Sequence, residues 1–67
     1  MSTVARVTEI SADSESSSDD AIKVAVDRAS QTLRGVTGAW VKEQEVQVRD
    51  GRIASYKVNL LVTFVLE

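Results

Sequence analysis

The 67-residue chain, which we interpret as one domain over residues 1–67, is short enough that its own core leaves it only marginally stable. It has no cysteine and no histidine, which excludes disulfides, thiolate chemistry and the commonest metal ligand, so association into a homo-oligomer remains as the source of stability. Its net charge of −2, with no long apolar run and no signal-peptide pattern, excludes a general affinity for nucleic acid and a membrane-spanning segment, and we expect a cytoplasmic protein.

The first twenty residues predict a strand, a connector and the start of a helix. Residues Thr3–Ile10 are rich in β-branched side chains, which is typical of a strand. The polar stretch Ser11–Ser18 reads as a connecting loop. Ser17 stands three residues before Asp20, a variant of the capping box, and therefore predicts that a helix begins here.

The next segment predicts an amphipathic helix of about five turns. Its apolar residues recur with helical spacing and form one stripe: Ile22, Ala25, Val26, Ala29 and Leu33. Arg34 lies in the predicted last turn, and Gly35 follows as a residue that can end a helix in the left-handed conformation. Because only one side is apolar, this helix needs a sheet to cover.

A long hairpin fills the rest of the chain. Residues Ala39–Arg49 and Arg52–Glu67 are rich in strand-forming side chains and flank Asp50-Gly51, the preferred sequence of a type I′ turn. If these two residues form the turn, each residue of the first arm lies opposite the residue of the second arm whose number brings the sum to 101. The pairs include Arg49 with Arg52, Val48 with Ile53, Gln44 with Lys57, and Trp40 with Leu61.

This register sorts the hairpin into two faces. One face of the second arm is continuously apolar, and the helix should cover it: Tyr56, Val58, Leu60, Val62, Phe64 and Leu66. The opposite face also carries apolar side chains, although a sheet covered on one side should be polar on the other: Trp40, Val46, Val48, Leu61 and Val65. A patch of this size indicates a subunit interface or a ligand site.

The order of elements predicts an α+β subunit with β-α-β-β topology. Return through the helix leaves the first strand antiparallel to the third, so an antiparallel three-stranded sheet has the order 1-3-2. The apolar run Leu60–Leu66 suits a central strand, whereas the charged run Lys42–Glu45 suits an edge strand.

The sequence offers no catalytic group and predicts a protein that is not an enzyme. Glu43 and Glu45 fall on the predicted edge strand beside Lys42 and read as solvated charges. Trp40, the only tryptophan, falls close to Gly38 on the face opposite the helix. It is either an interface anchor or a stacking platform for a planar ligand.

The helix sequence DDAIKVAVDRASQTLR and the hairpin GAWVKEQEVQVRDGRIASYKVNLLVTFVLE resemble the dodecin family over essentially the whole chain. The resemblance implies a β-α-β-β subunit that assembles into a hollow homododecamer. It also implies a non-catalytic role in storing or buffering flavins (riboflavin, FMN or FAD), which stack against a tryptophan of the second strand.

The family's tryptophan position matches Gly38 here, and Trp40 lies two residues later on the same face, about 6.6 Å along the strand. The family's glutamine position matches Lys57. The resemblance thus makes Trp40, Lys57, Gln44 and Gly38 the candidate flavin-binding residues. The alternative is a dodecin-like particle that does not hold flavin in this way, being structural, calcium-binding or coenzyme A-binding, with Trp40 as an interface residue.

Overall fold

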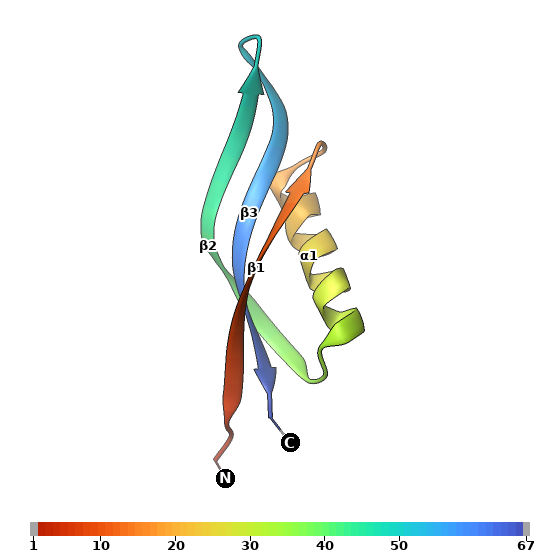
Figure 1. Ribbon diagram of the computed structural model, residues 1–67, viewed down its shortest axis with the longest axis vertical. Coiled ribbons are helices and arrows are strands. Elements are labelled where there is room, and N and C mark those ends of the chain that lie inside the picture. Colours follow the sequence, from red (N-terminus) through yellow and green to blue (C-terminus); the bar gives the residue numbers. More distant parts are fainter. Residues whose placement is uncertain (1, 67) are drawn as a thin grey trace.

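A computed structural model describes residues 2–66. Its elements follow the predicted β-α-β-β order (Figure 1): β1 (Ala5–Ser14), α1 (Ser18–Thr32), β2 (Val36–Arg49) and β3 (Arg52–Val65). The three strands form one antiparallel sheet in the predicted order β1-β3-β2, and α1 lies on one face of it. The predicted strand end at Glu67 lies outside the described residues.

β1 runs four residues further than its composition predicts. The serine-rich start of the expected loop, Ser11–Ser14, instead continues the strand and pairs with residues 56–59 of β3. Serine and aspartate are poor strand formers, but a ladder with a central strand overrides that weak preference. The prediction of a loop from Ser11 was therefore wrong, and the connector shrinks to residues 15–17.

The start of α1 confirms the predicted cap. The Ser17 hydroxyl oxygen accepts a hydrogen bond from the Asp20 backbone N–H at 2.9 Å. The Asp20 carboxylate does not complete a reciprocal capping box; it accepts a 2.6 Å hydrogen bond from the hydroxyl of buried Ser14. Ser14 also accepts a hydrogen bond from the backbone N–H of Ser16 at 3.0 Å, so this serine ties the end of β1 to the start of α1.

The helix ends earlier than predicted. Its last residue is Thr32, and Leu33 already has an extended backbone while its N–H donates to the Ala29 carbonyl at 2.8 Å. Arg34 therefore lies beyond the helix, and Gly35 takes the left-handed conformation (φ +72°) two residues after Leu33. In the part of the chain that the structure describes, no helix has the length and hydrophobicity needed to cross a membrane.

The β2–β3 hairpin matches the predicted pairing near the turn and around Trp40, but not between these points and not at its far end, where Val36 lies opposite Phe64. Near the turn Val48 lies opposite Ile53, and further along Trp40 lies opposite Leu61, as predicted. Between these points the ladder shifts by one residue, because Ala54 of β3 and later Lys42 of β2 are each an extra residue without an opposite partner. The two insertions lie on opposite strands, so the second one restores the register.

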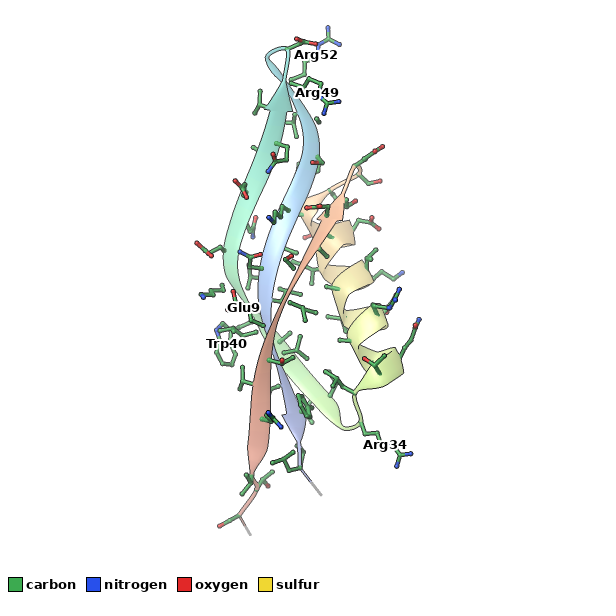
Figure 2. All side chains as sticks on the ribbon, viewed as in Figure 1. Glu9, Arg34, Trp40, Arg49 and Arg52 are labelled. Carbon is green, nitrogen blue, oxygen red and sulfur yellow. The ribbon has the colours of Figure 1, made fainter. Side chains whose placement is uncertain are left out.

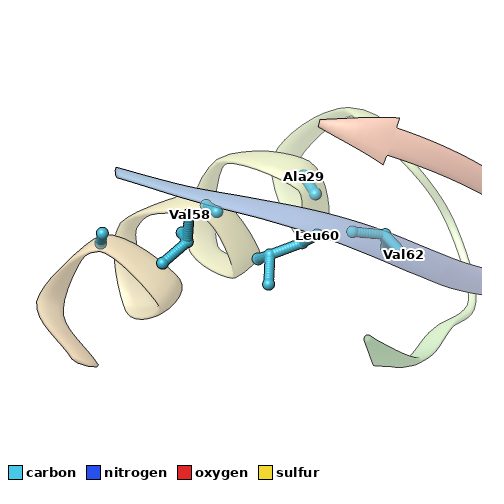
Figure 3. Packing of buried hydrophobic residues seen from close by; sticks show 6 residues of the cluster. Ala29, Val58, Leu60 and Val62 are labelled. Atoms are coloured by element: carbon cyan, nitrogen blue, oxygen red, sulfur yellow. The ribbon is translucent and has the colours of Figure 1, made fainter. Parts of the chain in front are cut away.

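The core lies between α1 and the centre of β3 (Figure 3). The helix contributes only small residues and β3 contributes larger ones, and together they form the buried set Ala21, Ala25, Ala29, Val58, Leu60 and Val62. The predicted stripe is confirmed at Ala25 and Ala29. Ile22, Val26 and Leu33 are only partly buried, and Ala21 was not predicted. The alanines let the helix approach the sheet closely.

The turn at Asp50-Gly51 provides a direct test of the hairpin. Both residues have positive φ, +53° and +74°, as a type I′ turn requires. Replacing Gly51 by valine should lower the free energy of unfolding by about 1–2 kcal/mol, because a β-branched side chain is strained in this conformation. A denaturant titration measures the loss, and Gly51→Asn is the matched control because asparagine tolerates positive φ. Equal losses in both variants would mean that the backbone conformation of this residue is not the cause.

Candidate functional site

The face of the sheet turned away from α1 carries the candidate site, and we call it the outer face. Cross-strand partners share a face, so the register orders this face into rows across β1, β3 and β2. Successive rows contain Val7, Thr63 and Gly38; then Glu9, Leu61 and Trp40; then Ser11, Asn59 and Glu43; then Asp13, Lys57 and Glu45. The outer face is therefore apolar around Trp40 and polar around Lys57.

Trp40 is the centre of the apolar part. Its side chain projects from β2 on the side away from the helix (Figure 2) and is 53% exposed, which leaves the indole accessible. Leu61 lies beside it and is half-buried. In the next row Gly38 has open space where a side chain would stand, with no heavy atom within 4 Å of an added Cβ. A flat ring could therefore lie over this part of the sheet without a clash at Gly38.

An ion pair borders Trp40. Lys42, displaced by the irregularity in β2, places its Nζ 3.2 Å and 3.3 Å from the two carboxylate oxygens of Glu9. Both side chains are about half exposed, 48% and 47%. A pair this well solvated adds little to stability, but it fixes one positive and one negative group at the edge of the apolar patch.

The polar part of the outer face forms a shallow depression of about 290 Å³ lined by Glu43, Gln44, Glu45, Lys57 and Asn59. Lys57 stands between Asp13 and Glu45 on the neighbouring strands. The Asn59 amide donates a hydrogen bond to a Glu43 carboxylate oxygen at 3.2 Å. The depression thus offers donors and acceptors side by side, with an excess of carboxylates.

The structure does not bring all four predicted site residues together. Gly38 and Trp40 are neighbours on the outer face, and Lys57 shares that face. Lys57, however, is four residues from Leu61 along β3, about 13 Å at the usual rise. Asn59, which the sequence analysis did not single out, shares this face and lies halfway between them along β3. The only feature of the sequence that could have identified Asn59 as a site residue is its position two residues from Leu61, the partner of Trp40.

Gln44 is a predicted site residue that the observed register places on a different face from the one predicted. Its predicted pairing with Lys57 is wrong: Gln44 lies opposite Val58, and Lys57 lies opposite Glu45. Because Val58 is fully buried under α1, its partner Gln44 belongs to the helix face, although it also borders the polar depression. The cause is the extra residue Lys42, which reverses the alternation of side chains between Trp40 and Gln44.

The same register shift also changes which residues belong to the apolar patch that the sequence predicts. Val46 lies opposite Tyr56, which shares the helix face of β3 with Val58, so Val46 and the next residue of that face, Val48, are not on the outer face. The same holds for Ile53, the partner of Val48. The apolar part of the outer face is therefore centred on Trp40 and Leu61, with Val7 and the predicted Val65 further along the same face.

The carboxylates of the subunit do not form a metal site by themselves. Over residues 2–66, no three aspartate or glutamate side chains come together in a group that could hold a metal ion. A cation held by carboxylates such as Glu43 and Glu45 would therefore need further oxygen ligands, from amides, backbone carbonyls, water or another subunit.

Comparisons with known proteins agree with this geometry. The family model described as Dodecin matches residues 4–67. A dodecin from Streptomyces coelicolor is 40% identical, with a TM-score of 0.91 over 97% of this chain and 93% of the other. A dodecin from Streptomyces davaonensis is 37% identical, with a TM-score of 0.92 over 100% and 98% of the two chains.

A calcium-chelating dodecin from Mycobacterium tuberculosis is also similar to the chain. It is 32% identical, with a TM-score of 0.81 over 96% of this chain and 91% of the other. Among curated proteins, none matches the sequence significantly. The similarity thus extends to a solved structure whose name includes calcium as a ligand.

Proposed function

The chain belongs to the dodecin family, and from this premise we propose that it is a non-catalytic flavin-binding protein that stores or buffers flavin as a homododecamer. Membership of the family implies a small binding protein that works as an oligomer. The observation that carries the flavin proposal is the half-exposed indole of Trp40, which lies beside Leu61 and the open space at Gly38.

An isoalloxazine ring has the properties that this surface would select. It is planar and aromatic, so it stacks on an indole, and its edge carries hydrogen-bond donors and acceptors. With the ring on Trp40, the amide of Asn59 lies closer to the ring edge than Lys57 does. Lys57, about 13 Å along the strand, would then contact a more distant group of the ligand or a flavin held mainly by a neighbouring subunit.

A second candidate function is a dodecin particle that does not stack flavin. Two observations favour it: Glu43 and Glu45 line the polar depression, and one similar protein is a calcium-chelating dodecin. Calcium takes six to eight oxygen ligands, so in this reading carboxylates of several subunits would share the ion. Trp40 would then pack between subunits and would not bind the ligand.

A riboflavin titration of the purified particle tests the flavin proposal. We expect native mass measurement to give close to twelve chains, and flavin fluorescence and Trp40 fluorescence to fall together as riboflavin is added, because stacking quenches both. Calcium and coenzyme A are titrated in parallel. An assembled particle that leaves both fluorescence signals unchanged, while calcium or coenzyme A raises its melting temperature, would overturn the flavin proposal and favour the second function.

A further inference from the structure

The outer end of the hairpin is an arm without support from its own subunit. β1 pairs with β3 only as far as Ser14, which lies opposite Tyr56. Residues 46–55, which we call the arm, continue past the ends of β1 and α1 as two strands alone (Figure 1). Residues 46–53 are all exposed. A two-stranded ribbon is marginally stable in water, so the arm needs a surface to pack on.

One side of the arm is apolar. Val46 and Val48 point to the same side because they are two residues apart in β2, and the extra residue at this point, Ala54, lies on β3. Ile53, the partner of Val48, joins them. Their exposed fractions are 44%, 64% and 53%. These three β-branched residues, which we call the arm strip, form one exposed apolar patch on the arm, and such patches mark sites of interaction with other proteins.

A groove that could receive such a strip lies elsewhere on the subunit. It runs between α1 and β1, has a volume of about 450 Å³ and is mostly apolar. Its apolar lining includes Ile10, Ala12, Val24, Ala25, Ala29 and Leu33. Val24 is 48% exposed, and Arg28 is the charged residue of the lining. We call it the α1–β1 groove.

The arm cannot reach the groove of its own subunit, because it points away from the end of the sheet beyond both walls of the groove (Figure 1). A projection and a matching hollow at different places on one chain make a head-to-tail contact, and such contacts form closed rings when the rotation between copies closes. We propose that the arm strip of one subunit packs into the α1–β1 groove of a second copy. This inference rests on the homo-oligomer of the proposed function and does not depend on flavin.

Charge favours a second copy as the occupant. Arg49 and Arg52 stand opposite each other at the tip of the arm, where like charges repel, and Asp50 in the turn offsets only one of these two charges. The groove leads toward the acidic connection between β1 and α1, where residues 11–22 contain no basic side chain. The acidic residues there are Asp13, Glu15, Asp19 and Asp20. With the strip in the groove and the tip directed toward this end, the tip arginines would meet these acidic side chains.

Cysteine cross-linking tests the contact, because the natural chain has no cysteine. Val48→Cys and Val24→Cys chains, with different tags, are assembled together and mildly oxidised. We expect a disulfide-linked dimer that carries both tags, formed at least tenfold faster than any dimer from either chain alone. Val4→Cys paired with Val24→Cys is the matched control, because Val4 is 65% exposed and Val48 is 64% exposed.

Assembly gives a second readout. Val48→Asp should shift the native mass toward smaller species at a chain concentration at which Val4→Asp stays assembled. Equal cross-linking in the control pair, arm-to-arm dimers of Val48→Cys alone, or full assembly of Val48→Asp would each overturn the proposed contact. A particle that cross-links as expected but binds no riboflavin would leave this contact standing and remove only the flavin function.

Discussion

Replacing Leu60 by alanine is expected to lower the free energy of unfolding by about 2–5 kcal/mol, the range for removing a large side chain from a packed core. Leu60 is only 1% exposed and is the largest fully buried side chain among residues 2–66. It packs against a helix face made of alanines (Figure 3), and these small side chains cannot move in to fill the space that it would leave. Domains in general are stable by only about 5–15 kcal/mol, so the loss is a large part of the total.

The measurement for Leu60→Ala is a denaturant titration at fixed chain concentration, combined with native mass, because folding and assembly are linked. Leu66→Ala is the matched control: it removes the same atoms from a side chain that is 49% exposed. We expect the control to lose clearly less stability. If the two variants unfold at the same denaturant concentration, the stability of the particle comes from contacts between subunits and not from the core under α1.

The fold could be predicted because its strongest signals are local. Asp50-Gly51 determines the turn, Ser17 determines the start of α1, and the apolar alternation from Val58 to Val62 identifies the face that the helix covers. Each of these three signals depends on the backbone conformation or the period of a single element. None of them requires knowledge of contacts with distant parts of the chain. The strand order then follows from the connections.

The misplaced residues have one common cause. Ala54 and Lys42 each add a residue to one strand of the hairpin, and nothing in their chemistry distinguishes them from ordinary strand residues. Such irregularities depend on how the whole sheet twists. Because the two insertions cancel, Trp40 was placed correctly, while Gln44, Val46 and Val48 between them were assigned to the wrong face. The apolar arm was therefore visible only in the structure.

The serine-rich end of β1 shows a second limit. A run of Ser11 to Ser14 with one alanine and one aspartate reads as a loop on propensity alone. Pairing with the central strand β3 makes it a strand, and burial of Ser14 with its hydrogen bond to Asp20 holds its end. The sequence contains both partners, but only the assembled sheet brings them within reach.

Replacing Trp40 by alanine is expected to weaken riboflavin binding roughly ten- to a hundredfold, since stacking of one ring on an aromatic side chain contributes about 1–3 kcal/mol. Flavin fluorescence measures the affinity, because the variant has no tryptophan of its own. Trp40→Phe keeps an aromatic face and should fall between the variant and the natural chain. Val41→Ala, at a neighbouring residue of the opposite face that is 39% exposed, should bind riboflavin normally.

The same variant separates the two functions proposed for Trp40. If the indole is a stacking platform, Trp40→Ala keeps the native mass and melting temperature of the particle and loses only flavin affinity. If the indole packs between subunits, the variant assembles less tightly, its melting temperature falls, and binding of calcium or another ligand by intact particles is little changed. An intact particle with unaltered riboflavin affinity would contradict both roles. Trp40 would then be an exposed side chain whose neighbours Leu61 and Gly38 do not form a site.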